Sequence, residues 1–264
     1  MNGKFVTGDV AHDPADRGLL LGDGVFETIA VQKARAIWLA EHITRMESAA
    51  GELGIPFNRE TILSSVAQIL EKTAADGEVL RITLSRGVAG HGLAGNGTSP
   101  TLLITLAEFS YAPSPQACRV KISTIRRNEH APSSRLKTLS YIDGIMAARE
   151  VADEADEALM LNTSGHVASA TIGNIFLLRN NTLVTPSLDQ GILPGIMRQK
   201  IIDAKFFATI ERPVSQQELG EADVVFLCNS LRPLRPISHL NGIALKQQSL
   251  EKLYSEITQL MLKG

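Results

Sequence analysis

The sequence predicts an α/β protein, of the α+β kind, that is divided into two domains. Its 264 residues are enough for two modest domains or one large one. Segments with helical spacing of apolar residues are interspersed with short strand-like runs. The stretch Tyr111–Ala117 has two prolines and no periodicity, which is typical of a linker. We therefore expect a smaller N-terminal α/β domain over 1–112, a linker and first strand over 113–125, and a larger mixed domain over 126–264.

The composition is that of an ordinary globular protein. It is 44% hydrophobic and 20% charged, and the net charge of -2 offers no basic surface for nucleic acid or an anionic membrane. No apolar run reaches the length of about 18 residues that a membrane span needs. The N-terminal segment MNGKFVTGDV lacks the apolar core of a signal peptide. Neither the two cysteines nor the six histidines have metal-site spacing, so we expect a reduced cytoplasmic setting and no metal.

The N-terminal half is predicted to contain two helices and several strands. Apolar residues recur at three- and four-residue steps from Trp38 to Leu53, and Gly54 ends this helix. The other elements expected here are strands at 1–10, VFETIAV (25–31), VLRITLSRG (79–87) and PTLLITLAEF (100–109), and a helix at Arg59–Thr73. The glycine-rich loop between the last two strands lacks the phosphate-loop pattern and opens no helix, so we interpret it as a mobile loop near a site entrance.

The C-terminal half is predicted to begin with a strand at RVKISTIRR (119–127). Lys137 follows in a short extended stretch, and a helix is expected over Tyr141–Ala152. The remaining elements expected are hairpins around TSG (163–165) and RNNT (179–182), a helix from LPGIMRQKIID (193–203), a strand in DVVFLCNS (223–230) and a helix over 246–262.

The strongest physical indication of a binding site is the helix start at LPGIM. Pro194 stands early in this segment, and the backbone amides near Gly195–Met197 have no partner within the helix. Such amides, together with the helix dipole, favour an anion such as phosphate. A simple helix cap is the alternative interpretation.

Two arginines in the N-terminal half are candidates for contacts to anions. His42 and Arg45 share one face of their helix, where we interpret Arg45 as functional and His42 as an ordinary surface residue. Arg86, at a strand end, either meets a substrate carboxylate or is simply solvated. Phe26 or Glu27 is expected at a pocket rim, with a plain loop and strand as the alternative.

Five motifs in this order resemble the class IV, fold-type IV pyridoxal-phosphate enzymes, which include branched-chain and D-amino-acid aminotransferases and aminodeoxychorismate lyase. The motifs are DRGLLLGDGVFET (16–28), EHITR (41–45), SSRLKTLSY (133–141), DEALMLNTSGHVASATIGNIFL (156–177) and LDQGILPGIMR (188–198). The resemblance implies a two-domain fold with the site at the domain interface, and a homodimer.

The resemblance also implies residue roles. Lys137 would hold pyridoxal 5'-phosphate as a Schiff base and then act as the general base, while Arg45 and the amides at Gly195–Met197 hold the phosphate. The expected cofactor-binding set is Arg45, Lys137, Ser169, Thr171, Gly195, Ile196, Met197 and Ser230, and the expected substrate contacts are Phe26, Arg86 and Asn229.

The sequence departs from the family pattern at two positions. The family usually has threonine where this chain has Met197, so a hydroxyl contact is lost although the amides remain. The family also has a glutamate, which faces the pyridine nitrogen, where this chain has Ser169 in SATIGN. A neutral hydroxyl makes the ring a weaker electron sink than a carboxylate partner does. We expect this change to favour β-elimination over transamination.

The function expected from these observations is lysis of aminodeoxychorismate to p-aminobenzoate and pyruvate, in folate synthesis. The chain is short for the family. Its segments LRITLSRG and CNSLRPLRPI resemble those of the lyase branch. The first alternative is a D-amino-acid or branched-chain aminotransferase. The second is a protein that binds pyridoxal phosphate with little catalysis.

Overall fold

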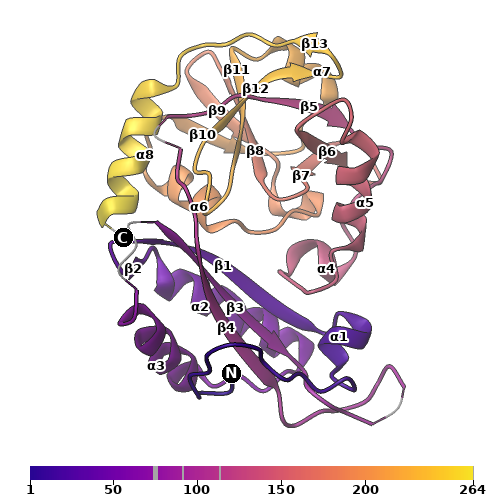
Figure 1. Cartoon of the computed structure of the whole chain (residues 1–264). Helices are drawn as coiled ribbons and strands as arrows, with labels where there is room; N and C mark the ends of the chain where they lie inside the picture. Colours follow the sequence, from indigo (N-terminus) through magenta and orange to yellow (C-terminus); the bar gives the residue numbers. More distant parts are fainter. Residues whose placement is uncertain (74–76, 91, 113, 264) are drawn as a thin grey trace. The chain divides into compact units, whose positions relative to one another are not determined.

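The computed structural model describes residues 1–73, 77–90, 92–112 and 114–263 (Figure 1). The chain divides into two compact units, and we describe each by itself. The first contains Met1–Tyr111 together with Leu136–Ser140, and the second contains Ala112–Arg135 and Tyr141–Lys263. The segment with Lys137 thus belongs to the first unit, whereas the domain bounds expected from the sequence include it in 126–264. Pro113 of the expected linker and His91 of the glycine-rich loop lie outside the described residues.

The first unit is built on a four-stranded antiparallel sheet in the order β2-β1-β3-β4. Its strands are β1 (Gly24–Gln32), β2 (Arg35–Ala36), β3 (Glu78–Ser85) and β4 (Thr101–Glu108), and its helices are α1 (Arg17–Leu21), α2 (Leu39–Leu53) and α3 (Arg59–Leu70). Alternate strand residues such as Ile29 and Ile82 form one apolar core with Ile43 and Ile62 of the helices. The intervening residues, among them Phe26, therefore lie on the opposite face of the sheet.

In the first unit, one sequence expectation was wrong and one element was missed. Residues 1–10, all of them described, form no strand, because Gly3 and Gly8 adopt positive φ and only Asn2 bonds to the β4 edge, at Leu102. The short helix α1 was not predicted. Asp16 caps its first turn by accepting from the Gly18 amide, and Gly22 ends it at a φ of 68°.

The Lys137 segment runs alongside β1. The Phe26 amide donates to the Lys137 carbonyl at 3.0 Å, and the Leu139 amide donates to the Gly24 carbonyl at 2.9 Å. Val25 and Thr138 form a β-bridge between these bonds. The extended conformation predicted around Lys137 is confirmed.

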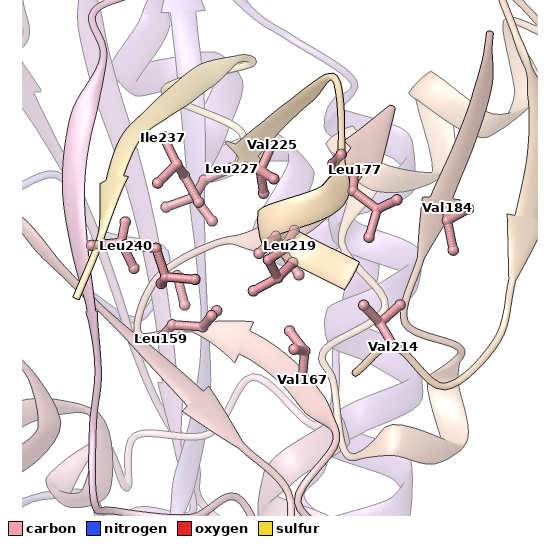
Figure 2. Close-up of a cluster of buried hydrophobic side chains, with 14 of the residues drawn as sticks. Leu159, Val167, Leu177, Val184, Val214, Leu219, Val225, Leu227, Ile237 and Leu240 are labelled. Atoms are coloured by element: carbon pink, nitrogen blue, oxygen red, sulfur yellow. The ribbon is translucent and has the colours of Figure 1, made fainter. Parts of the chain in front are cut away.

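The second unit contains a nine-stranded mixed sheet in the order β10-β9-β8-β11-β12-β5-β6-β7, with β13 paired to β12. Its strands are β5 (Cys118–Ile122), β6 (Glu157–Leu161), β7 (Val167–Ala170), β8 (Asn174–Arg179), β9 (Thr182–Thr185), β10 (Ala208–Glu211), β11 (Val224–Cys228), β12 (Arg235–Leu240) and β13 (Ile243–Ala244). Its helices are α4 (Pro132–Arg135), α5 (Ile142–Val151), the 3₁₀ turn η1 (Leu188–Gln190), α6 (Ile196–Asp203), α7 (Gln216–Glu221) and α8 (Glu251–Lys263). Figure 2 shows the apolar cluster between the strands and α7, in which Leu219 of α7 lies among strand residues such as Leu177 and Leu227.

The hairpin expected around TSG implied that HVASATIGNIFLL forms a single strand. The structure shows two strands instead. The run breaks at Thr171–Gly173 into β7 and β8, and the Ala170 amide donates to the Gly173 carbonyl at 2.9 Å. Within the described ranges, no helix is both long and apolar enough to cross a membrane.

Candidate functional site

In the first unit, a buried carboxylate joins two of the residues singled out on α2. Arg45 donates to Glu27 through Nε, at 2.8 Å from Oε1, and through Nη2, at 2.6 Å from Oε2. The Nδ1 atom of His42 lies 2.6 Å from the same Oε2. Burial would raise the pKa of Glu27, but the charge of Arg45 and the hydrogen bonds from His42 and Arg45 lower that pKa to about 2. Glu27 is therefore ionised and can only accept.

His42 is fully buried, so its interpretation as an ordinary surface residue was wrong. Burial lowers the pKa of His42 and the neighbouring charges of Arg45 and Lys137 add to this, against the opposing effect of Glu27. The imidazole is thus neutral at neutral pH, and its Nδ1–H donates to Glu27. The alternation of VFETIAV already placed Glu27 on one face with Val25 and Ile29, which was the signal that a polar partner for it would lie inside.

This depressed pKa predicts a loss of stability in acid. A carboxylate whose folded-state pKa is about 2, against an ordinary 4.5, stabilises the fold fully above pH 4.5, and this contribution disappears as the pH falls from 4.5 towards 2. We expect the free energy of unfolding to fall over this window by on the order of 3 kcal/mol more in the parent than in Glu27→Gln. Denaturant titrations at a series of pH values measure it, and equal pH slopes for the two proteins would contradict it.

Lys137 lies on the sheet face away from the helices, over an aromatic ring. Its Nζ is 4.3 Å from the centroid of the Phe26 ring, and the Cζ atom of Arg81 is 3.9 Å from the same centroid. Phe26 is buried, Lys137 is half-buried and Arg81 is exposed. Arg81 was not among the predicted site residues, although alternation with Leu80 and Ile82 in β3 places it on this face.

Arg86, the arginine expected to contact the substrate, is held by other residues of the first unit. It donates to Asp23 through Nε at 2.8 Å, and to the Leu53 and Gly54 carbonyls at 2.7 and 3.0 Å. Burial would raise the pKa of Asp23, but hydrogen bonds from Arg86 and Arg17 lower it below its ordinary value. Arg86 thus caps the C-terminal end of α2 by donating to its last carbonyl groups.

In the second unit, three predicted motifs come together around the break between β7 and β8. Asn174 donates through Nδ2 to the Leu193 carbonyl at 3.0 Å, which joins the SATIGN motif to LPGIM. Asn229, at the end of β11, donates to the Ile172 carbonyl at 3.2 Å, and half-buried Ser230 follows it. Asn174 was not among the predicted site residues, although it stands in the quoted motif.

The start of α6 has the features of an anion site. Gly195 is its N-cap, and among the residues that the structure describes no side chain caps this end. A Cβ atom on Gly195 would lie 2.0 Å from Oδ1 of Asn174, so only glycine fits. The side chain of Met197 is buried in the core and leaves its backbone amide as the polar group at this position. These features fit a bound phosphate.

Ser169 and Thr171 differ in what they offer to a ligand. The hydroxyl and the amide of Thr171 both donate to Oε1 of Glu157, so this hydroxyl can only accept from another group. Ser169 is paired with Met160 in the neighbouring strand, whereas Glu157 shares the face of Leu159. Glu157 therefore lies on the opposite face from Ser169 and does not replace the carboxylate that the family has there.

Comparisons of the sequence and of the structure with known proteins all point to one family. A model of the family Amino-transferase class IV matches residues 24–240. Aminodeoxychorismate lyase of Bacillus subtilis is 31% identical over 261 residues, which are 95% of this chain and 89% of that protein. The crystal structure of 4-amino-4-deoxychorismate lyase from Pseudomonas aeruginosa is 28% identical, with a TM-score of 0.84 and 96% of each chain covered. The crystal structure of the branched-chain aminotransferase from Thermoproteus uzoniensis with norvaline is 25% identical in sequence, with a TM-score of 0.90. The match covers 99% of this chain and 94% of that chain.

Proposed function

The chain belongs to the class IV aminotransferase family, and from this premise we propose that it is an aminodeoxychorismate lyase, which releases p-aminobenzoate and pyruvate. Membership confirms the fold type, the enzyme class and pyridoxal phosphate as the family's cofactor, as the motifs predicted. The observation that carries the lyase proposal is the similarity to a lyase along 95% of this chain. The same family includes aminotransferases, one of which is 25% identical to this chain.

The residues present in each unit, taken by itself, fit the cofactor. Gly195, Ile196 and Met197 would hold the phosphate through the uncapped amides of α6, and Arg45 and Ser230 would add side-chain donors. The Lys137 amine would bind the cofactor covalently and, once released, take the proton from the reacting carbon. When bound, pyridoxal phosphate withdraws electrons from that carbon.

Ser169 is the residue that we propose sets the reaction type. Its hydroxyl would donate to the pyridine nitrogen, and no charge pair would form there because Glu157 lies on the other face of the strand. Elimination expels a leaving group and therefore depends less on a strong electron sink than transamination does. This reasoning favours the lyase over the aminotransferase.

The decisive assay supplies aminodeoxychorismate to the cofactor-loaded protein without any keto acid. We expect p-aminobenzoate and pyruvate in equal amounts, measured by fluorescence and by a coupled dehydrogenase. Sustained amino transfer from D-alanine or a branched-chain amino acid to 2-oxoglutarate, without lysis, would contradict the proposal in favour of the aminotransferase. Cofactor binding without either reaction would favour the non-catalytic alternative. Ser169→Glu is the matched variant, and we expect it to gain transfer activity relative to lysis.

Arg81 is better placed than Arg86 to meet a carboxylate of the substrate. Its guanidinium contacts the Phe26 ring that Lys137 also contacts, whereas Arg86 donates to Asp23 and to the end of α2. We expect Arg81→Gln to raise KM for the carboxylate substrate about tenfold or more, from loss of a charged hydrogen bond. Arg86→Gln should mainly lower Tm. The reverse pattern in steady-state kinetics and thermal melts would return the substrate role to Arg86, and Asn229 remains a further proposed contact.

We also propose that the protein is a cytoplasmic homodimer. On α5, the neighbouring side chains Ile142, Ile145 and Met146 are 59%, 44% and 47% exposed and form an apolar stripe at helical spacing. We expect sedimentation equilibrium to give twice the mass of one chain, and Ile145→Glu to shift the protein towards monomer. A monomeric parent at micromolar concentration would contradict this assembly.

A further inference from the structure

Glu27, His42 and Arg45 form a group with more hydrogen bonds than a simple ion pair requires. Both carboxylate oxygens of Glu27 are engaged, Oε1 by Arg45 and Oε2 by Arg45 and His42 together. The side chains of Glu27 and His42 have no exposed surface, while that of Arg45 keeps 14%. The arginine is therefore the member of the group that reaches the surface of the first unit.

The contact fixes the direction of the guanidinium. A carboxylate that accepts from Nε and Nη2 lies in the guanidinium plane, and Nη1 then lies on the side away from it. A bond to a single oxygen would leave the plane free to rotate. The buried group thus determines the direction of the whole guanidinium of Arg45, Nη1 included.

His42 fixes the carboxylate in turn. Its neutral ring donates Nδ1–H to Oε2, and it stands three residues before Arg45 on α2, on the same side of the helix. The charges of Glu27 and Arg45 offset each other inside the unit, so His42 adds orientation without adding charge.

We propose that Glu27 and His42 are positioning residues that aim Arg45 at the phosphate of the cofactor. This inference rests on the proposed function, in which Arg45 binds that phosphate. It predicts that the two residues act on recognition of the phosphate rather than only on stability.

The test compares the dissociation constants of pyridoxal phosphate and of pyridoxal, which lacks the phosphate, by fluorescence titration. We expect Glu27→Gln and His42→Leu each to weaken binding of the phosphate form at least tenfold while pyridoxal binding stays within twofold. His42→Asn keeps an N–H near the position of Nδ1 and should restore most of the preference. Glu47→Gln is the matched control, because it breaks an exposed ion pair of the same helix with Arg59, and it should change neither constant.

The outcomes separate this inference from the proposed function. If Arg45→Gln abolishes the preference for the phosphate form but folded Glu27→Gln and His42→Leu keep it, the positioning role is wrong. If Arg45→Gln itself keeps the preference, the assignment of Arg45 to the phosphate fails first. Should Glu27→Gln not fold, the pair His42→Leu and His42→Asn decides, since equal preference in both would overturn the proposal.

Discussion

Lys137→Ala is expected to lose the visible absorbance band of the lysine-bound cofactor and to lose lyase activity. The backbone on both sides of Lys137 is bonded to β1, and its amine lies over the Phe26 ring, so the variant removes the amine without removing these backbone bonds. Loss of the proton transfer alone lowers kcat by roughly 10² to 10⁴-fold, and loss of the covalent attachment adds to this.

The matched control for this variant is Lys72→Ala. Lys72 also places its amine over a phenylalanine ring, 4.5 Å from the centroid of Phe5. The control should keep the band and the activity, so the effect at Lys137 would be specific to the site. An unchanged band in Lys137→Ala would contradict the assignment of the anchor.

Gly195→Ala is expected to weaken binding of pyridoxal phosphate more than tenfold. The added Cβ would lie 2.0 Å from Asn174 Oδ1, so either the start of α6 or Asn174 must move. A move of α6 displaces the amides proposed for the phosphate, and a move of Asn174 breaks its bond to the Leu193 carbonyl. Overpacking of this kind also costs about 1–3 kcal/mol of stability.

Two further variants define the origin of that effect. In Gly220→Ala on α7, the new Cβ meets no atom of another described segment within 4 Å, so this variant should leave both affinity and stability unharmed. The double variant Gly195→Ala with Asn174→Ala removes the clash and should recover part of the lost stability. Titration of the cofactor and urea unfolding measure both quantities. Full affinity in Gly195→Ala would show that the α6 amides do not hold the phosphate.

Local pattern was enough to predict most elements of the fold. The helix at Leu39–Leu53 and the strands β3 and β4 follow directly from spacing of apolar residues and from the glycine that ends α2. Lys137, Gly195 and Ser169 could be singled out because each stands in a motif with a recognisable order along the chain.

The residue contacts that could not be predicted from the sequence depend on pairing between segments that are distant along the chain. The buried partner of His42 is Glu27, which lies on β1 and not on α2, and the role of Arg86 depends on Asp23 and the end of α2. The question whether Glu157 replaces the missing glutamate was decided by the register of β6 and β7, which no spacing along the chain reveals. The contact of Arg81 with Phe26 was hidden for the same reason, since the two residues lie in different strands.

The most direct test of the account is to identify the residue that binds the cofactor. The protein loaded with pyridoxal phosphate is reduced with borohydride, which makes the bond to lysine permanent, then digested and mapped by mass spectrometry. We predict one labelled peptide, with the cofactor on Lys137, and no label in Lys137→Ala. Label on another lysine, or none in the parent, would contradict the site on which the proposed function rests.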